Sequence, residues 1–399
     1  RPITKIEIED MKVKITNNTN QNGKTYLDVV ATPTRYYDSY RISKVSYEES
    51  GEIKEKEVEE RVNVEFYKEI YSYEDWQTIE ENTYQNYRLM NDIDFKDKSN
   101  IKTDLTIGKL EGNNHKLSNI NLVLNSSNSG FIKTVKTILK DVTFENINIT
   151  NTASGIRTGI IANTNATVSN ITLNNVIVDA PKLDQVGFIG RSTSESIENI
   201  TMDTVKITGK SYVAGYAGSS VLPMLRTVEA NNLTIVGNGD HVGGILSSPE
   251  KRNGYNMKYV TVQNSNITGK NNVGGIFGNL SGGATNPTQG QYLKIMNSSI
   301  TGVSTVGGVA GEFFDSNSFE AYHITVKGSG SNIGGIVAKG NLSNNIIEDS
   351  IIEGISSNSN NVGGVIGAPS WGGGNNRAIN CTVSSKGNNV GGIFGYYNH

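Results

Sequence analysis

Apolar and polar residues alternate along most of the chain, in short runs separated by glycine or asparagine. Clear examples are the runs Val142–Ile149, Ile171–Val178 and Val205–Thr208. Alternation with a period of two predicts β-strands, and no segment after residue 110 shows a sustained helical period. The pattern therefore predicts an all-β chain.

A second pattern repeats over a longer distance: a β-branched or apolar residue, then one or two small residues, then an apolar pair. We call the glycine just before the apolar pair the marker glycine. Marker glycines occur at Gly130, Gly159, Gly187, Gly215, Gly244, Gly275, Gly308, Gly335, Gly364 and Gly392, in steps of 27 to 33 residues. Self-similarity at such a period is typical of solenoids and other repeat folds.

Each repeat offers two or three short strands but too little apolar surface to fold alone, so neighbouring repeats must stack. We predict a parallel β-helix of about ten ~29-residue coils over residues 105–399. The twin glycines suit close backbone approach or a positive-φ corner, and the many asparagines suit left-handed corners and side-chain ladders. A bladed propeller is the main alternative, but its repeats are longer, about 40 to 50 residues.

The N-terminal part has a different composition, since residues 1–110 hold only three of the 44 glycines. We expect a small antiparallel β domain over residues 1–66 and a lead-in over residues 67–104. Ser72 and Asp75 predict the start of a helix from about Tyr73 to Glu81. Its apolar face, Trp76 and Ile79, would plug the open end of the solenoid.

The repeat of the type Val273-Gly274-Gly275-Ile276-Phe277-Gly278 resembles the glycine-rich GLUG motif of bacterial surface proteins. These include the non-catalytic N-terminal regions of immunoglobulin A-cleaving zinc metallopeptidases. The stretches Tyr71–Ile79 and Tyr87–Phe95 resemble the lead-in that precedes such arrays, so the resemblance covers roughly residues 65 to 399. It implies a β-helix from an extracellular or cell-surface protein. It does not separate adhesins from peptidases, because the motif occurs in both.

Net charge and composition exclude some classes of binding partner. A net charge of -3 and a pI of about 5.9 argue against a polyanionic partner such as nucleic acid. No stretch is long and apolar enough to insert into a membrane, and the single Cys381 predicts no internal disulfide. The chain starts without a methionine and ends inside a repeat, so we expect a monomeric fragment of a longer secreted or wall-attached protein.

Motifs for catalysis, metals and cofactors are not found in the sequence. His115, His241, His323 and His399 stand apart from one another, and none belongs to a His-Glu-x-x-His zinc motif. We therefore expect no metal, no cofactor and no catalytic residue in this part of the protein. One local cluster, Asp240-His241 with Glu250-Lys251-Arg252, and a second, Glu312 with Asp315 and Glu320, are interpreted as polar corners and loops.

Binding has a more specific candidate. Four repeats carry unusual residues after the marker strand, at Ser247–Asn256, Asn279–Gln291, Glu312–Tyr322 and Ala368–Asn376. Insertions at one phase of a solenoid project from one face. That face would display five aromatic side chains to a host protein or glycan: Tyr255, Phe313, Phe314, Phe319 and Trp371. The alternative is that these rings fold back and cover the flank of the helix.

Together these patterns predict a non-catalytic extracellular module that binds a host ligand, promotes adhesion or recruits a substrate for a larger bacterial protein. Two alternatives stay open. In the first alternative, the array is a rigid spacer without a ligand. In the second, it is a β-helix lyase or hydrolase with its site around Asp240.

Overall fold

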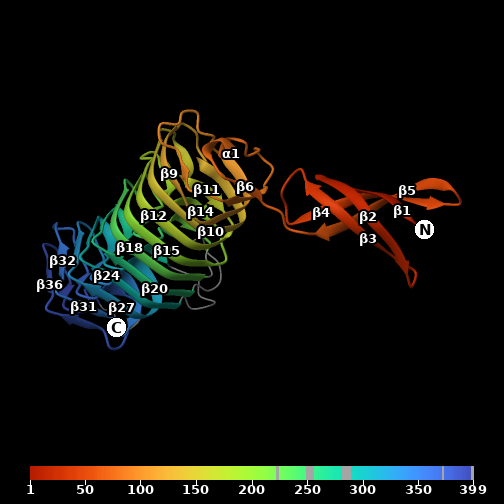
Figure 1. Cartoon of the computed structure of the whole chain (residues 1–399). Coiled ribbons are helices and arrows are strands. Elements are labelled where there is room, and N and C mark those ends of the chain that lie inside the picture. The colour runs from red at the N-terminus through yellow and green to blue at the C-terminus, as the bar shows by residue number, and fades with distance from the viewer. Residues whose placement is uncertain (222–223, 249–255, 281–288, 371–372, 397–399) are drawn as a thin grey trace.

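The computed structural model describes the chain apart from residues 222–223, 249–255, 281–288, 371–372 and 397–399. Its fold is all-β, as predicted: a five-stranded antiparallel sheet followed by a parallel β-solenoid of about nine turns, close to the ten expected. Figure 1 shows the sheet projecting from the N-terminal end of the solenoid.

The N-terminal sheet has the strand order β3-β2-β1-β4-β5. Its strands are β1 (Ile3–Ile8), β2 (Met11–Gln21), β3 (Lys24–Pro33), β4 (Ser39–Glu49) and β5 (Glu52–Asn63). Of residues 1–66 only Tyr40 and Ser46 are buried, so this sheet is a single layer with little core of its own.

The lead-in comprises β6 (Lys68–Ile70), α1 (Tyr73–Gln77), β7 (Asn86–Leu89) and β8 (Ile93–Asp94). Strand β6 pairs in parallel with β7, and both β7 and β8 pair in parallel with β9 (Leu105–Leu124). The lead-in therefore already belongs to the solenoid, which begins before the expected residue 105.

Helix α1 begins as predicted. The backbone N–H of Asp75 donates to Ser72 Oγ (3.2 Å), and Asp75 Oδ2 accepts from the backbone N–H of Tyr71 (2.8 Å). The helix ends at Gln77, earlier than the expected Glu81. Thr78 is its C-cap residue, and the Thr78 hydroxyl donates to the Asp75 carbonyl (2.6 Å) and accepts from Lys68 Nζ (2.6 Å).

The predicted plug is confirmed. Trp76 and Ile79 are fully buried in the core that continues through the solenoid. The Trp76 ring stacks on Phe131 (5.1 Å between centroids) and meets Phe95 edge-on (5.9 Å). These contacts cover the first coils, whose apolar interior would otherwise face solvent.

Each coil has three sides. In the early coils one long strand bends through the first two sides: β12 (Thr167–Asp179), β15 (Ile197–Gly209) and β18 (Met224–Gly237). Strand β10 (Ser129–Asn151) also includes part of the third side, since its residues 129–135 pair with β11 (Gly155–Thr164). Later first-side strands are β20 (Asn256–Gln263), β24 (Gln289–Met296), β31 (Ile346–Glu348), β35 (Arg377–Ile379) and the second part of β27 (Ala310–Tyr322), whose first residues belong to the third side. Later second-side strands are β21 (Asn266–Thr268), β25 (Ser299–Gly302), β28 (Thr325–Gly328), β32 (Ile351–Gly354) and β36 (Thr382–Ser385).

The third side carries the marker glycines. Its strands in the first half are β11 (Gly155–Thr164), β13 (Leu183–Val186), β14 (Ile189–Ser192), β16 (Val213–Ala214), β17 (Ala217–Ser220) and β19 (Val242–Gly243). In the second half they are β22 (Asn271–Gly274), β23 (Phe277–Leu280), β26 (Ser304–Gly307), β29 (Ile333–Gly334), β30 (Val337–Ser343), β33 (Val362–Gly363), β34 (Ile366–Pro369) and β37 (Val390–Gly391).

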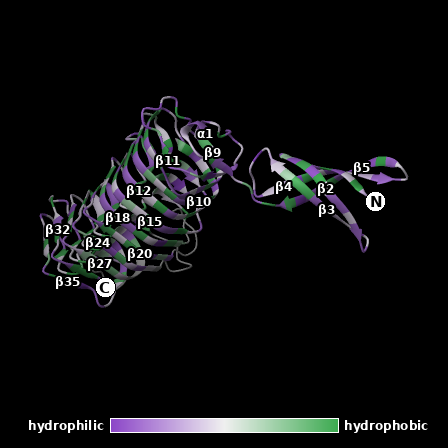
Figure 2. Ribbon diagram, viewed as in Figure 1, coloured by the Kyte–Doolittle hydropathy of each residue, from purple (hydrophilic) through white to green (hydrophobic). Residues whose placement is uncertain are grey.

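Like residues stack on like. The valine before the twin glycines pairs in register from coil to coil, from Val213 to Val242, Val273 and Val306, and all four are buried. Figure 2 shows hydrophobic and hydrophilic residues interspersed along the solenoid strands, as the two-residue alternation predicts. The inward residues form one continuous core, and the outward residues form rows along the axis.

The marker glycines permit close backbone approach. A Cβ at Gly308 would lie far inside van der Waals contact of the Gly335 carbonyl oxygen, and one at Gly335 would do the same at Gly364. Neither glycine needs a positive φ. Of the two roles predicted for the twin glycines, close approach is the one observed.

Many corners are formed by asparagine, as expected, and others by residues such as Thr227 and His241. Asn119, Asn146 and Asn175 all have φ between 54° and 59°, which is left-handed backbone. Their side chains form a ladder, in which Asn146 Nδ2 donates to Asn119 Oδ1 (3.1 Å) and Asn175 Nδ2 donates to Asn146 Oδ1 (2.9 Å). The ladder satisfies polar groups at the place where each strand bends.

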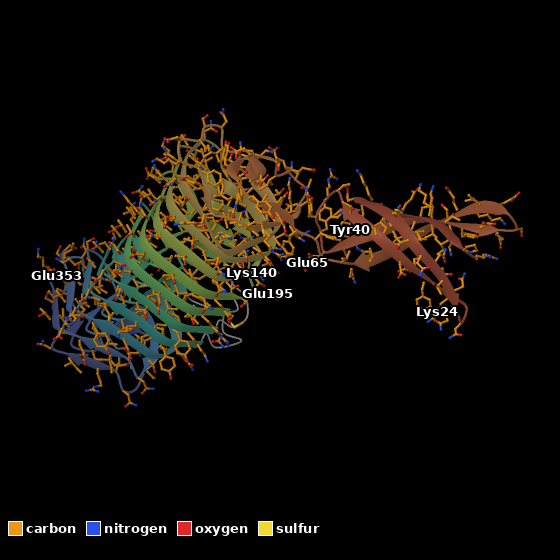
Figure 3. The ribbon with its side chains drawn as sticks, viewed as in Figure 1. Lys24, Tyr40, Glu65, Lys140, Glu195 and Glu353 are labelled. Carbon is orange, nitrogen blue, oxygen red and sulfur yellow. The ribbon has the colours of Figure 1, made fainter. Side chains whose placement is uncertain are left out.

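Ion pairs and backbone hydrogen bonds join the N-terminal sheet to the solenoid. Lys109 Nζ pairs with Asp38 (2.8 Å) and Glu65 (3.3 Å), and the backbone N–H of Asn86 donates to the Tyr36 carbonyl (2.7 Å). Burial lowers the pKa of Lys109, but the two carboxylates outweigh it and raise the pKa overall. Figure 3 places Glu65 between the sheet and the solenoid.

The plug yields a stability prediction. Trp76→Ala removes a stacked, buried ring and should lower the free energy of unfolding by about 3–5 kcal/mol. Tyr71→Ala, one residue before the helix N-cap and 48% exposed, is the matched control and should have a small effect. Denaturant unfolding of both variants measures the difference. Equal stabilities would contradict the role of Trp76 as a plug.

A second prediction concerns glycine stacking. Gly308→Ala should destabilise the solenoid, because the new methyl group would collide with the Gly335 carbonyl. Gly374→Ala is the control, since nothing lies within 4 Å of a Cβ built there. Thermal unfolding should show a lower midpoint for Gly308→Ala alone. A similar midpoint for both variants would show that close approach does not restrict this position.

Candidate functional site

The aromatic face expected from the sequence does not form with Phe313 and Phe319. Both rings are fully buried and meet edge to face, 5.0 Å apart. The predicted insert around them is the continuous strand β27, which pairs with β24 and β30. Gly290 makes the room: a Cβ there would lie 2.8 Å from the Phe319 ring and 3.0 Å from the Phe313 ring. For these two residues the alternative, rings folded back onto the helix, is correct.

The other three candidates stay untested. Tyr255 and Trp371 lie outside the described residues. The backbone of Phe314 pairs with Asn341 in β27 and β30, but its side chain also lies outside what the structure describes.

The cluster around Asp240 contains a polar corner. Asp240 Oδ1 accepts from the backbone N–H (3.2 Å) and the side-chain amide (2.9 Å) of Asn271 on the next coil. His241 has φ 61° and stacks on Tyr212 (4.7 Å). Its predicted partners, residues 250–252, lie outside the described part. The Asp240 carboxylate is thus held by the neighbouring coil.

The second acidic cluster consists of separate local contacts. Glu312 accepts from the Asn279 amide (3.4 Å), and Glu320 accepts from the Tyr322 hydroxyl (3.2 Å). The side chain of Asp315 lies outside the described residues. The described contacts therefore give these acids local partners.

A different place on the first side has the geometry of a site. A groove of about 300 Å³ crosses β15, β18 and β20. Its outward side chains form two rows across these strands, Thr201 with Glu229 and Thr261, and Asp203 with Asn231 and Gln263. We call this the polar groove. Its rows are regular because the strands pair in register.

Hydrogen bonds fix one row of the polar groove and leave the other open. Asn231 Nδ2 donates to Asp203 Oδ1 (2.6 Å), and Asn231 Oδ1 accepts from Asn264 Nδ2 (2.8 Å). Glu229 is exposed and makes no hydrogen bond or ion pair with another described residue. The groove thus combines a positioned carboxylate with one that is available to a ligand.

Two tyrosines stand beside the polar groove. Tyr259 and Tyr292 occupy the corner before the first side on successive coils, and their rings stack in parallel, with centroids 5.2 Å apart and an interplanar angle of 2°. They remain 56% and 55% exposed. Tyr259 lies two residues before Thr261 on β20, so its ring stands at the margin of the groove.

The tyrosine pair occupies left-handed corners, as Tyr212, Thr227, His241 and Ser318 also do. Tyr259 and Tyr292 have φ of 60° and 58°, while Asn170 and Asn199 hold the same corner in earlier coils. Left-handed backbone costs about 1–2 kcal/mol for a residue other than glycine, asparagine or aspartate. An exposed ring recovers little of that cost by burial. The stacking and exposure of this pair beside the polar groove, and not the backbone conformation that other corners share, make it a candidate for binding.

Sequence reasoning missed these tyrosines although a signal was present. They lie 33 residues apart, the same step as Gly275 to Gly308, and each precedes an alternating run. Alignment of the repeats at this corner, and not only at the marker glycines, would have shown tyrosine in positions of asparagine.

The chain matches no protein-family model, no curated protein and no solved structure in the comparisons made. Among the described residues, no helix has the length and apolar character to span a membrane. Within the same residues, no three His, Cys, Asp or Glu side chains are grouped so as to hold a metal ion. The function is therefore inferred from the geometry of the polar groove and its tyrosines.

His241 gives a prediction about pH. Burial lowers its pKa, and Asp240 offsets this only in part. Because the folded state binds the proton more weakly than the unfolded state, stability should fall as the pH drops below the ordinary histidine value of about 6.5. His241→Asn, the residue that such corners prefer, should flatten this dependence. Chemical denaturation at pH 5 to 8 measures it.

His323→Asn is the control, since His323 is also a left-handed corner residue but its side chain is 62% exposed. This variant should retain the pH dependence that His241 causes. The same slope in wild-type protein and His241→Asn would contradict the assignment to His241.

Proposed function

We propose that this chain is a non-catalytic extracellular binding module, adhesive or substrate-recruiting, of a larger bacterial surface or secreted protein. Its ligand binds the polar groove and the adjoining tyrosine pair. The observation that carries the proposal is the stacked and exposed pair Tyr259 and Tyr292. The resemblance of the repeats to GLUG arrays supports the extracellular setting.

The tyrosines suit recognition because an aromatic ring offers a large contact area with few rotatable bonds. Stacking restricts each ring further, so little conformational entropy is lost on binding. The polar groove adds directional contacts through Glu229 and the hydroxyls of Thr201 and Thr261. A rigid scaffold of paired strands holds both parts in register.

An open surface favours binding over catalysis. Thr201 and Glu229 are exposed, so the polar groove is open to water. Enzymes that cleave glycans or peptides commonly enclose the reacting bond and exclude water. A binding surface needs no such enclosure.

The test is a binding screen on immobilised glycans and extracellular host proteins. Replacement of both Tyr259 and Tyr292 by alanine should raise the Kd of the ligand about tenfold or more, which corresponds to a loss of about 1.4 kcal/mol in binding free energy. Tyr26→Ala is the matched control, because Tyr26 is 55% exposed but lies on β3 of the N-terminal sheet. Circular dichroism should show all variants folded.

Binding that survives the double replacement would remove this face from the proposal, and no saturable ligand at all would favour a spacer. Release of reducing ends from any glycan in the panel would replace the proposal with a hydrolase or lyase.

A further inference from the structure

We infer that the ligand of the polar groove is a neutral, hydroxyl-rich glycan, and that Glu229 excludes glycans bearing acidic groups. This inference rests on the proposed function and deepens it. It uses three observations: the free outer faces of the tyrosine stack, two rows of hydrogen-bonding side chains, and a groove lining that contains carboxylates but no cation.

Only the outer faces of the tyrosine stack are open to a ligand, since the inner faces cover each other. At the same corner, the coil on the groove side of Tyr259 carries Thr227, which is much smaller. Coils are separated by about 4.8 Å, the spacing of paired strands. A flat apolar surface, such as the C–H face of a pyranose, therefore fits against the Tyr259 ring above Thr227.

A sugar placed there extends its hydroxyls over the polar groove. Glu229 pairs in register with Thr261, on the strand that carries Tyr259 two residues earlier. Its carboxylate has no partner among the described residues and can accept two hydroxyl hydrogen bonds. Thr201 lies on the far side of Glu229, so a chain of sugars running along the solenoid axis meets hydroxyl and carboxylate groups on consecutive coils.

Charge selects against acidic glycans. The lining residues carry two carboxylates, Asp203 and Glu229, and no basic side chain. The row that contains Glu229 and Thr261 continues on β24 with Lys294. The Lys294 ammonium, however, lies over the Tyr322 ring (5.1 Å from the centroid). A uronic acid or sulfate bound against the groove-lining residues would therefore face like charges; the neighbouring cations, Arg226 and Lys258, precede the corner residues Thr227 and Tyr259 and do not line the groove.

A peptide ligand fits this surface less well. Extended peptides commonly bind by adding a strand to an open sheet edge. Here β18 is paired with β15 on one side and β20 on the other, so its backbone groups are already used. Recognition must come from side chains, and the exposed groups available are mainly hydroxyl, amide and carboxylate.

The experiment compares neutral and acidic oligosaccharides of equal length by calorimetry: a panel of neutral glucose and N-acetylglucosamine oligomers of different linkage, and oligogalacturonate. Wild-type protein should bind at least one neutral oligomer and bind oligogalacturonate at least tenfold more weakly. Glu229→Lys should weaken the neutral ligand and strengthen oligogalacturonate, reducing or reversing the preference. Glu59→Lys makes the same change in net charge on the N-terminal sheet, where Glu59 is 89% exposed, and should leave the preference unchanged.

Tight binding of oligogalacturonate by wild-type protein would overturn the inference, and so would an unchanged preference in Glu229→Lys. Suppose that the protein binds a protein ligand, or another ligand that is not a neutral oligomer, and that this binding depends on Tyr259 and Tyr292. That result would overturn the inference about glycans while the proposed binding function stands. Ligand binding that does not depend on Tyr259 and Tyr292 would overturn both the glycan inference and the proposed binding site.

Discussion

The structure depends on the stacking of each coil on the next in strict register. Parallel backbone hydrogen bonds set the spacing, and glycines such as Gly308 and Gly335 let neighbouring chains approach where a methyl group would collide. Register has two consequences at once. Inward valines and isoleucines share one core, and outward side chains fall into rows. The polar groove is part of such rows, so the interaction that holds the fold together also builds the site.

Register also explains which parts of the fold could be predicted. The Val-Gly-Gly pattern and the corner asparagines contain local information, because each reports a backbone requirement at its own position. The helix N-cap at Ser72 is equally local. The end of that helix was predicted four residues too late: its C-cap residue is Thr78, whose hydroxyl accepts from Lys68 of strand β6. Contacts between different elements leave little trace in a single sequence.

The site shows the same limit more sharply. Phe313 and Phe319 were expected outside because they follow a marker strand in a segment interpreted as an insertion, yet they are buried, and Gly290, one coil earlier, leaves room for them. Tyr259 and Tyr292 could not be recognised from the marker glycines alone, because these glycines do not define the corner that the tyrosines occupy. Their significance appears only when they are placed at a left-handed corner, in contact with each other and beside Glu229.

Corner residues have a further consequence for how such a protein diversifies. At the corner before the first side, the backbone has the same conformation with Asn170, Thr227 or Tyr259, and each side chain points away from the core. Exchange of one corner residue therefore alters the outer surface of a single coil while the interior keeps its packing. Selection can revise recognition one coil at a time, without a new fold and without compensating changes elsewhere in the chain.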